Sequence, residues 1–245
     1  FKCEKCRLVH ALELAAQGNH AVIVSSGDPG VFAMAAAVFE AVESGPAPWR
    51  DLDIRVLPGT FLYHGSPLAV VQGEPLGEDL ARKVRGAFTV ANVRSFDQDP
   101  RFGVIALSEV ALRALSPAVN DPGNAIDVIG RQVRLLTLWS EGWHKAELHK
   151  AEYPRLRVPP LRYDDICDDA FHLIARDAAG QIDVLIRLVK ALDALRRIGP
   201  EAARQAADRQ LRLACDRGLA GLPADHDRDR LHQVLDELDR LWRAA

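Results

Sequence analysis

Residues 20–30, His-Ala-Val-Ile-Val-Ser-Ser-Gly-Asp-Pro-Gly, begin the stretch of the chain that decides its predicted N-terminal fold. Their β-branched apolar run, Val-Ile-Val, is typical of a buried parallel strand. Asp28 and Pro29 suit the N-cap and the first turn of a helix over residues 30–43, and residues 53–57 (Asp-Ile-Arg-Val-Leu) predict a second strand. This order of elements predicts a right-handed βαβ unit.

The loop between the first strand and the helix has the features of a ligand site. Glycines let the backbone approach a bound molecule closely, and the free amides at the start of the helix can donate hydrogen bonds to a carboxylate or a phosphate. Ligands in open parallel sheets lie beyond the carboxyl ends of the strands, where the Pro-Gly pair after the second strand is also expected. An ordinary turn is the alternative, because Gly-Asp-Pro is also a common turn sequence. The candidate cofactor-binding residues are Ser26, Gly27, Asp28, Pro29, Gly30, Pro58 and Gly59.

Composition excludes several classes of function. With 245 residues the chain can form one large domain or two modest ones. Its net charge of -3 and its pI near 6.3 give no basic field for nucleic acid. Its apolar runs fall far short of the roughly 18 residues that span a bilayer. The four cysteines are scattered, and the Cys3-x-x-Cys6 pair lacks a second half, so we expect a cytoplasmic protein without a metal ion.

Helical periodicity dominates the chain after residue 60. Residues 61–71 predict half of a β-hairpin with a turn at Gly-Ser-Pro, and another short strand is predicted at residues 156–158. Apolar residues at intervals of three and four predict helices over residues 78–93, 102–115, 125–139, 164–176, 181–198, 200–218 and 225–245. The predicted fold class is therefore α+β and mostly α-helical, with an N-terminal βαβ fragment, a short β-hairpin region and a C-terminal helical bundle.

Four polar residues gather at the predicted corner between two of these helices: Arg113, Ser116, Asn120 and Asp121. They could bind a small ligand or a protein partner. Alternatively, Ser116 and Asp121 cap the two helices and Asn120 fixes the turn between them, and we favour this interpretation. The acidic pairs at residues 164–165 and 168–169 suit either a cation or, as we favour, a solvated helix N-terminus.

Residues 7–59 resemble the S-adenosylmethionine-dependent tetrapyrrole methylases, specifically the precorrin-3B C17-methyltransferases of cobalamin biosynthesis. The resemblance is carried by residues 11–18 (Ala-Leu-Glu-Leu-Ala-Ala-Gln-Gly), 24–40 (Val-Ser-Ser-Gly-Asp-Pro-Gly-Val-Phe-Ala-Met-Ala-Ala-Ala-Val-Phe-Glu) and 54–59 (Ile-Arg-Val-Leu-Pro-Gly). It implies that the Gly-Asp-Pro-Gly loop lies at an S-adenosyl-L-methionine site between two α/β domains, and that a tetrapyrrole is methylated at a ring carbon. The family's opening strand with its Gly-Pro-Gly loop, and its second α/β domain, have no counterpart here. We therefore expect the segment not to be catalytic alone.

Residues 53–245 resemble a second family, the bacterial predicted membrane proteins with domain of unknown function 2254. This resemblance is carried by residues 99–103 (Asp-Pro-Arg-Phe-Gly), 111–122 (Ala-Leu-Arg-Ala-Leu-Ser-Pro-Ala-Val-Asn-Asp-Pro) and 163–171 (Tyr-Asp-Asp-Ile-Cys-Asp-Asp-Ala-Phe). It implies that this part corresponds to the soluble region of a membrane-anchored protein whose transmembrane helices would precede it. The resemblance implies no reaction.

The two resemblances predict a composite protein. Residues 1–59 are expected to form a partial methylase-like α/β segment, and residues 60–245 a mainly helical domain. The predicted function is a regulatory or interaction module of a membrane-protein family, joined to a truncated methylase segment and located at the inner face of the bacterial membrane. We expect a protein partner or a second copy of the chain, and no nucleic acid. Methyl transfer from S-adenosyl-L-methionine to a tetrapyrrole is the alternative.

Overall fold

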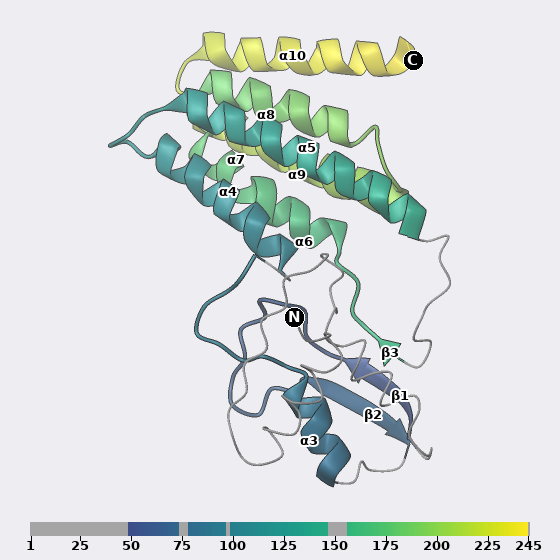
Figure 1. Cartoon of the computed structure of the whole chain (residues 1–245). Coiled ribbons are helices and arrows are strands. Elements are labelled where there is room, and N and C mark those ends of the chain that lie inside the picture. Colours follow the sequence, from purple (N-terminus) through teal and green to yellow (C-terminus); the bar gives the residue numbers. More distant parts are fainter. Residues whose placement is uncertain (1–48, 74–77, 97–98, 147–155, 245) are drawn as a thin grey trace, which may run out of the picture. The chain divides into compact units, whose positions relative to one another are not determined.

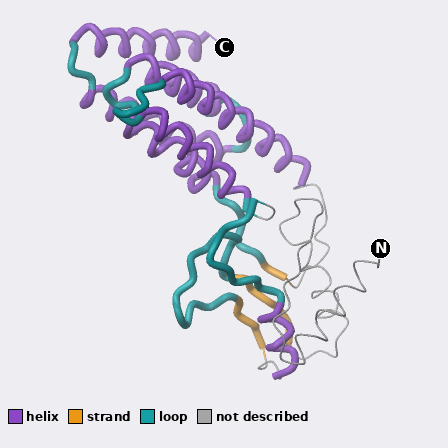
Figure 2. Tube along the Cα trace, turned by 60° about the vertical axis from the view of Figure 1, so that its left-hand side comes forward, coloured by secondary structure: helices purple, strands orange, loops and turns teal. Residues whose placement is uncertain are grey.

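The computed structural model describes residues 49–73, 78–96, 99–146 and 156–244. These residues fall into two compact units, a small one within 49–102 and 156–160 and a larger one within 103–146 and 161–244. Figure 2 shows that the strands belong to the small unit and that the larger unit is helical. The elements predicted before residue 49, including the loop with Ser26, Gly27, Asp28, Pro29 and Gly30, lie outside the described residues, as do Cys3 and Cys6. The domain boundary expected near residue 60 stays a prediction.

Among its described residues, the small unit contains a three-stranded sheet in the order β2-β1-β3. Strand β1 (Trp49–Ile54) pairs antiparallel with β2 (Ala69–Gly73) and parallel with the short β3 (Leu156–Arg157). Alternation along β1 places Leu52 and Ile54 on one face, where both are buried. β1 lies a few residues earlier than the predicted strand at 53–57, and its antiparallel partner begins only at Ala69. The hairpin half predicted at residues 61–71 is therefore mostly a loop.

Helix α3 (Glu78–Gly86) provides the remainder of the small core. Its Val84 packs with Leu52 and Ile54, and the partly buried Phe88 joins the same cluster. The prediction of a helix as far as residue 93 was wrong. The chain leaves the helix at Gly86, and the next two amides bond to carbonyls three residues back.

The larger unit is a helical bundle (Figure 1). Its elements are, in chain order, α4 (Pro100–Leu115), α5 (Pro122–Ala146), α6 (Tyr163–Cys167), the π-helical segment η1 (Asp168–His172), α7 (Leu173–Asp177), α8 (Ile182–Leu195), α9 (Glu201–Gly221) and α10 (Asp225–Ala244). The first three residues of α4 belong to the small unit. Segments α6, η1 and α7 follow one another without a break. None of the helices in the described part of the chain is long and apolar enough to cross a bilayer.

Helix α8 forms the centre of the bundle, in contact with α5, α9 and α10. Its apolar stripe, which has the spacing expected of a core helix, is fully buried: Val184, Leu185, Leu188, Val189 and Leu192. Ile129 of α5, Phe171 of η1 and Leu231 of α10 complete the same core with no exposed surface. The mostly helical α+β class predicted from periodicity is confirmed, although α5 continues past the expected end at residue 139.

Candidate functional site

Residues 57–60, which include the predicted ligand residues Pro58 and Gly59, form a tight turn. The amide of Thr60 donates a hydrogen bond to Leu57 O at 3.1 Å, and the Thr60 hydroxyl donates to the same oxygen at 2.7 Å. Gly59 has a φ of 77°, in the left-handed region. Proline followed by a glycine of positive φ is the sequence of a type II turn. The Pro-Gly pair therefore has a structural explanation within the described residues, and its role in cofactor binding stays a prediction.

An ion pair between the buried Asp99 and the partly exposed Arg94 packs against Gly59. A Cβ at this position would lie 1.9 Å from Asp99 Oδ2 and 2.6 Å from Arg94 Nε. Asp99 is 3% exposed, accepts a hydrogen bond from Arg94 Nε at 2.6 Å, and accepts another from the amide of Phe102 at 3.0 Å. Its carboxylate thereby caps the start of α4 while it neutralises Arg94. The aspartate that opens the Asp-Pro-Arg-Phe-Gly motif thus fixes the loop before α4 and packs closely against the turn at Gly59.

A second turn follows the first at once. The amide of Ser66 donates to Tyr63 O at 3.0 Å, the amide of Tyr63 donates to the Ser66 hydroxyl at 3.0 Å, and Gly65 has a φ of 83°. In each turn the last residue, Thr60 or Ser66, thus provides a hydroxyl that hydrogen-bonds to the backbone of the first residue, Leu57 or Tyr63. Two such turns fix the backbone on both sides of Phe61, whose ring lies 5.1 Å from that of Tyr63.

The two locked loops expose large apolar side chains. We call them the apolar loop patch, and its members with their exposed fractions are Phe61 (78%), Tyr63 (74%), Val90 (70%), Val93 (81%) and Phe96 (65%). Phe96 is held in place by stacking on the ring of Phe102 at 4.5 Å, and the guanidinium of Arg94 lies 5.1 Å from that same ring. Single exposed apolar residues are normal on protein surfaces, but a group of this kind commonly marks an interaction site. This surface was not predicted from the sequence, because residues 61–71 were assigned to half of a β-hairpin and residues 78–93 to a helix.

The polar corner predicted as a ligand or partner site is assembled as a pair of helix caps. The Ser116 hydroxyl donates to Arg113 O at 2.7 Å at the end of α4. The Asp121 carboxylate accepts the amide of Asn124 at 3.1 Å at the start of α5. Asn120 has a φ of 47°, which asparagine tolerates better than most residues. The structure brings Arg113, Ser116, Asn120 and Asp121 together in the geometry of the capping interpretation.

The π-helical segment η1 is tied to α4 and α5 by a buried polar network. The Ser108 hydroxyl lies 2.6 Å from Asp169 O and 3.0 Å from Ala170 O, both of which can accept its proton. Gln132, fully buried on α5, donates to Val104 O at 2.8 Å and contacts the Ser108 hydroxyl at 3.2 Å. A π-helical turn breaks the regular ladder of helical hydrogen bonds. The serine therefore supplies a donor where the ladder is irregular.

The acidic pairs of this region are used in ion pairing. Asp164 and Asp168 both face Arg209 of α9, which donates to Asp164 Oδ1 at 2.5 Å. The hydrogen bond from Arg209 lowers the pKa of Asp164 below its ordinary value, although partial burial opposes this. Among the described residues, no group of three His, Cys, Asp or Glu side chains could hold a metal ion. The ion pairs with Arg209 are in keeping with the favoured interpretation of a charged helix surface.

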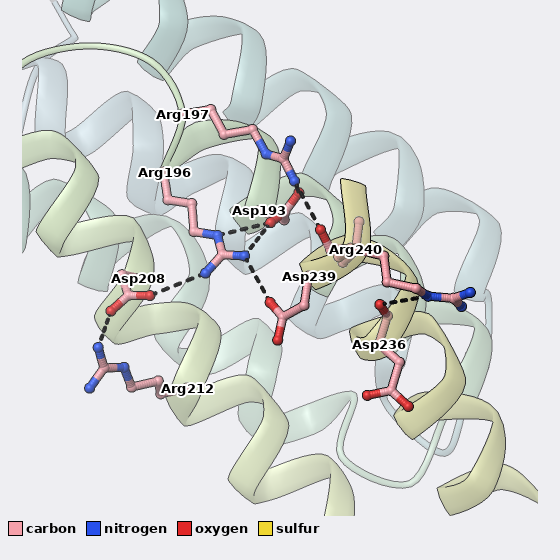
Figure 3. Close-up of polar contacts among 9 residues, drawn as sticks. Asp193, Arg196, Arg197, Asp208, Arg212, Asp236, Asp239 and Arg240 are labelled. Atoms are coloured by element: carbon pink, nitrogen blue, oxygen red, sulfur yellow. Dashed lines mark hydrogen bonds and ion pairs between the residues drawn. The ribbon is translucent and has the colours of Figure 1, made fainter. Parts of the chain in front are cut away.

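Asp193 is a buried carboxylate that ties α8 to α10 (Figure 3). It is 4% exposed and accepts hydrogen bonds from Arg196 Nε at 2.8 Å and from Arg197 Nη2 at 2.6 Å. Arg197 also donates to Leu238 O at 3.4 Å, and Arg196 lies 3.6 Å from Asp239. Burial opposes the charge of Arg196, but the hydrogen bond from its side chain to Asp193 and the surrounding carboxylates raise its pKa. The cluster has a clear structural role.

The two cysteines of the bundle are poor nucleophiles. Burial raises the pKa of Cys167 to about 12 and that of Cys215 to about 11. The thiolate is the reactive form, and at neutral pH neither side chain supplies it. The described residues thus offer no activated thiol.

The family to which the chain belongs follows from a match that covers both units. The family model described as a predicted membrane protein, DUF2254, matches residues 49–194, more than half of the chain. The chain belongs to this family. The DUF2254 match includes the paired turns, the Asp99–Arg94 ion pair, the polar corner and the π-helical segment. The resemblance predicted for the second part of the chain is confirmed.

Two relatives from cobalamin biosynthesis match about 30% of the chain. It is 49% identical over 71 residues to a precorrin-3B C(17)-methyltransferase from Sinorhizobium, which covers 28% of this chain and 26% of that protein. It is 44% identical over 78 residues to the cobalamin biosynthesis protein CobIJ of Mycobacterium tuberculosis, of which it covers 14%. An uncharacterized protein of the same organism is 42% identical over 53 residues, which are 22% of this chain and 10% of that protein. The chain thus spans about a quarter or less of these relatives, and the composite character is confirmed. No solved structure matches it.

Proposed function

We propose that the chain is an interaction module of a DUF2254 membrane protein and that the apolar loop patch is its contact surface. The observation that carries this proposal is the exposure of five large apolar side chains on two loops of the small unit. Their exposure is built into the fold, because turns and an ion pair hold the backbone beneath them. A surface that is preorganised in this way loses little conformational entropy when it binds.

The other polar clusters support the same assignment. Three polar clusters form hydrogen bonds with other groups of the fold and so have structural roles. They are the corner between α4 and α5, the network at η1 and the ion pairs of Asp193. A regulatory or scaffolding role at the inner face of the membrane is in keeping with the family description of a predicted membrane protein.

Association with native membranes tests the proposal. We expect the purified chain to sediment with bacterial inner-membrane vesicles, and the double variant Phe61→Ser/Tyr63→Ser to stay in the supernatant. The matched control is Val119→Ser/Leu138→Ser, which removes two apolar side chains, each 55% exposed, from the larger unit. The control should sediment as the unchanged chain does. Equal sedimentation of all three proteins, or of none, would overturn the proposal.

A second candidate is S-adenosyl-L-methionine binding by the N-terminal segment. It is favoured by the 49% identity to a precorrin-3B C(17)-methyltransferase and by the glycine-rich loop at Ser26–Gly30, whose residue types suit a helix N-terminal ligand site. A tetrapyrrole would then be the substrate. Calorimetry decides the matter, because a micromolar site that Gly27→Val abolishes supports it. The absence of heat at millimolar S-adenosyl-L-methionine would dismiss it.

A further inference from the structure

We propose that helix α10 is a strap that opens and closes on the larger unit while the rest of the bundle stays folded. α10 is the last helix in the described part of the chain, and it lies along α8 at the outside of the bundle (Figure 1). Its burial, its charges and the loop before it each support a reversible opening. The strap belongs to the larger unit, so it is independent of the apolar loop patch.

Helix α10 contributes little to the core for a helix of 20 residues. Among its residues 225–241, only Leu231 and Leu238 are buried, whereas α8 and α9 bury seven residues each. Val234 and Leu235 are partly buried, and Leu241 is 55% exposed. The free energy that holds an element to a core grows with the apolar area that it buries, so α10 is held less firmly than its neighbours.

The charged cluster at the end of α8 stays satisfied when α10 leaves. Asp193 accepts hydrogen bonds from Arg196 at 2.8 Å and from Arg197 at 2.6 Å, and all three residues lie at the end of α8 or directly after it (Figure 3). The contacts of these arginines with α10 are longer, at 3.6 Å to Asp239 and 3.4 Å to Leu238 O. An opening that left a buried charge unpaired would be costly. Opening of α10 avoids this cost, since Asp193 keeps both donors.

The ion pairs that do reach across to α10 are open to water. Arg230 of α10 lies 3.3 Å from Asp183 of α8, and both side chains are exposed. Asp239, which faces Arg196, is exposed as well. Exposed ion pairs contribute little to stability, and dissolved salt screens them. These contacts therefore guide the closing of α10 but do not lock it.

The short loop between α9 and α10 provides the hinge. Leu222 is buried, and its amide donates to Gly218 O at 2.9 Å, which anchors the loop to α9. Arg228 donates to Leu222 O, so the first turn of α10 stays close to the pivot. Pro223 and Ala224 between them are exposed. Proline has no amide hydrogen, so a rotation there breaks no hydrogen bond of its own amide.

Opening uncovers the contact between α8 and α9. A Cβ at Gly218 would lie 2.9 Å from Leu185 Cδ1 of α8 and 3.2 Å from Leu231 Cδ2 of α10. Leu231 therefore covers the point where these two helices meet, and it has no exposed surface in the closed state. When α10 opens, apolar surface of α8 and α9 faces water. The larger unit thus presents two different surfaces in its two states.

Hydrogen exchange of the full chain under native conditions, measured by mass spectrometry, tests the strap. We expect the most protected amides of α10 to open at least about tenfold more often than those of α8. Leu238→Ala should increase the opening of α10 roughly tenfold or more. The matched control is Leu241→Ala, which shortens an exposed leucine of the same helix and should leave the opening of α10 unchanged.

Ser108→Ala separates local opening from unfolding of the bundle. It weakens the network between α4 and η1, far from the hinge in sequence, and should speed the exchange of α8 roughly fivefold or more. The exchange of α10 should not change, because the strap opens without that network being broken. Equal acceleration of both helices would overturn the proposal, as would equal opening of α8 and α10 in the unchanged chain. The second comparison needs no variant, so it decides even if Leu238→Ala fails to fold.

Discussion

Replacement of Gly59 by alanine tests whether the two loops are locked as the structure shows. The new Cβ would lie 1.9 Å from Asp99 Oδ2, so the carboxylate has to move away from Arg94. Alanine in the left-handed region costs about 1 kcal/mol. Loss of the charged hydrogen bond to a carboxylate that is 3% exposed costs about 2 kcal/mol more. We expect the small unit to lose about 3 kcal/mol of its free energy of unfolding.

Gly65→Ala is the matched control for this variant. Gly65 has a φ of 83°, close to that of Gly59, but nothing lies within 4 Å of its Cβ position. It should therefore lose only the backbone contribution of about 1 kcal/mol. Hydrogen exchange measured by mass spectrometry on peptides that cover β1 and β2 gives the free energy of opening for both variants. Equal losses in the two variants would refute the steric lock.

Three further predictions concern the bundle. Ser108→Ala removes the donor to the η1 carbonyls and should lower the free energy of unfolding in urea by about 1–3 kcal/mol, so an unchanged midpoint would contradict the network. Gly218→Ala places a Cβ 2.9 Å from the Leu185 side chain of α8 and should lower Tm. Gly130→Ala adds a Cβ on open helix surface and should raise Tm. The opposite order of the two Tm values would argue against the packing described. Cys167 and Cys215 should resist iodoacetamide at pH 8 until the protein unfolds, as read from peptide masses. Because their folded pKa values lie above the ordinary 9.0, stability should fall as the pH rises from about 9 to about 12, and early alkylation would contradict their burial.

Local signals in the sequence predicted much of the bundle and the caps between α4 and α5. The apolar spacing of α8 marked a buried helix, because a stripe at intervals of three and four has to face a core. Pro58 and Gly59 were predicted as ligand residues, and the structure shows that they form a tight turn, because proline and glycine have the backbone angles that such a turn requires. The caps provided by Ser116 and Asp121 also followed from residue type. In each case the physical cause acts within a few residues along the chain.

Features that depend on distant contacts were missed. The helix predicted to end at residue 139 continues to Ala146 in α5, which packs on α8. The π-helical segment η1 is stabilised by Ser108, some sixty residues earlier in the chain. Phe61 and Tyr63 of the apolar loop patch were assigned to a β-hairpin, and Val90 and Val93 to a helix that ends earlier, at Gly86. The pairing of β1 starts only at Ala69, which leaves Phe61 and Tyr63 in a loop.

The position of helix α9 has a consequence for how this family is divided into modules. The stretch that defines DUF2254 ends at residue 194, one position after Asp193. Yet α9, which follows it, buries Ala206, Ala207 and Ala214 in the same core as the stripe of α8. A recombination event that cut the gene at that boundary would leave one side of α8 in water. We therefore expect that exchange of chain segments between family members gives a folded protein only when α9 is exchanged together with the residues before it.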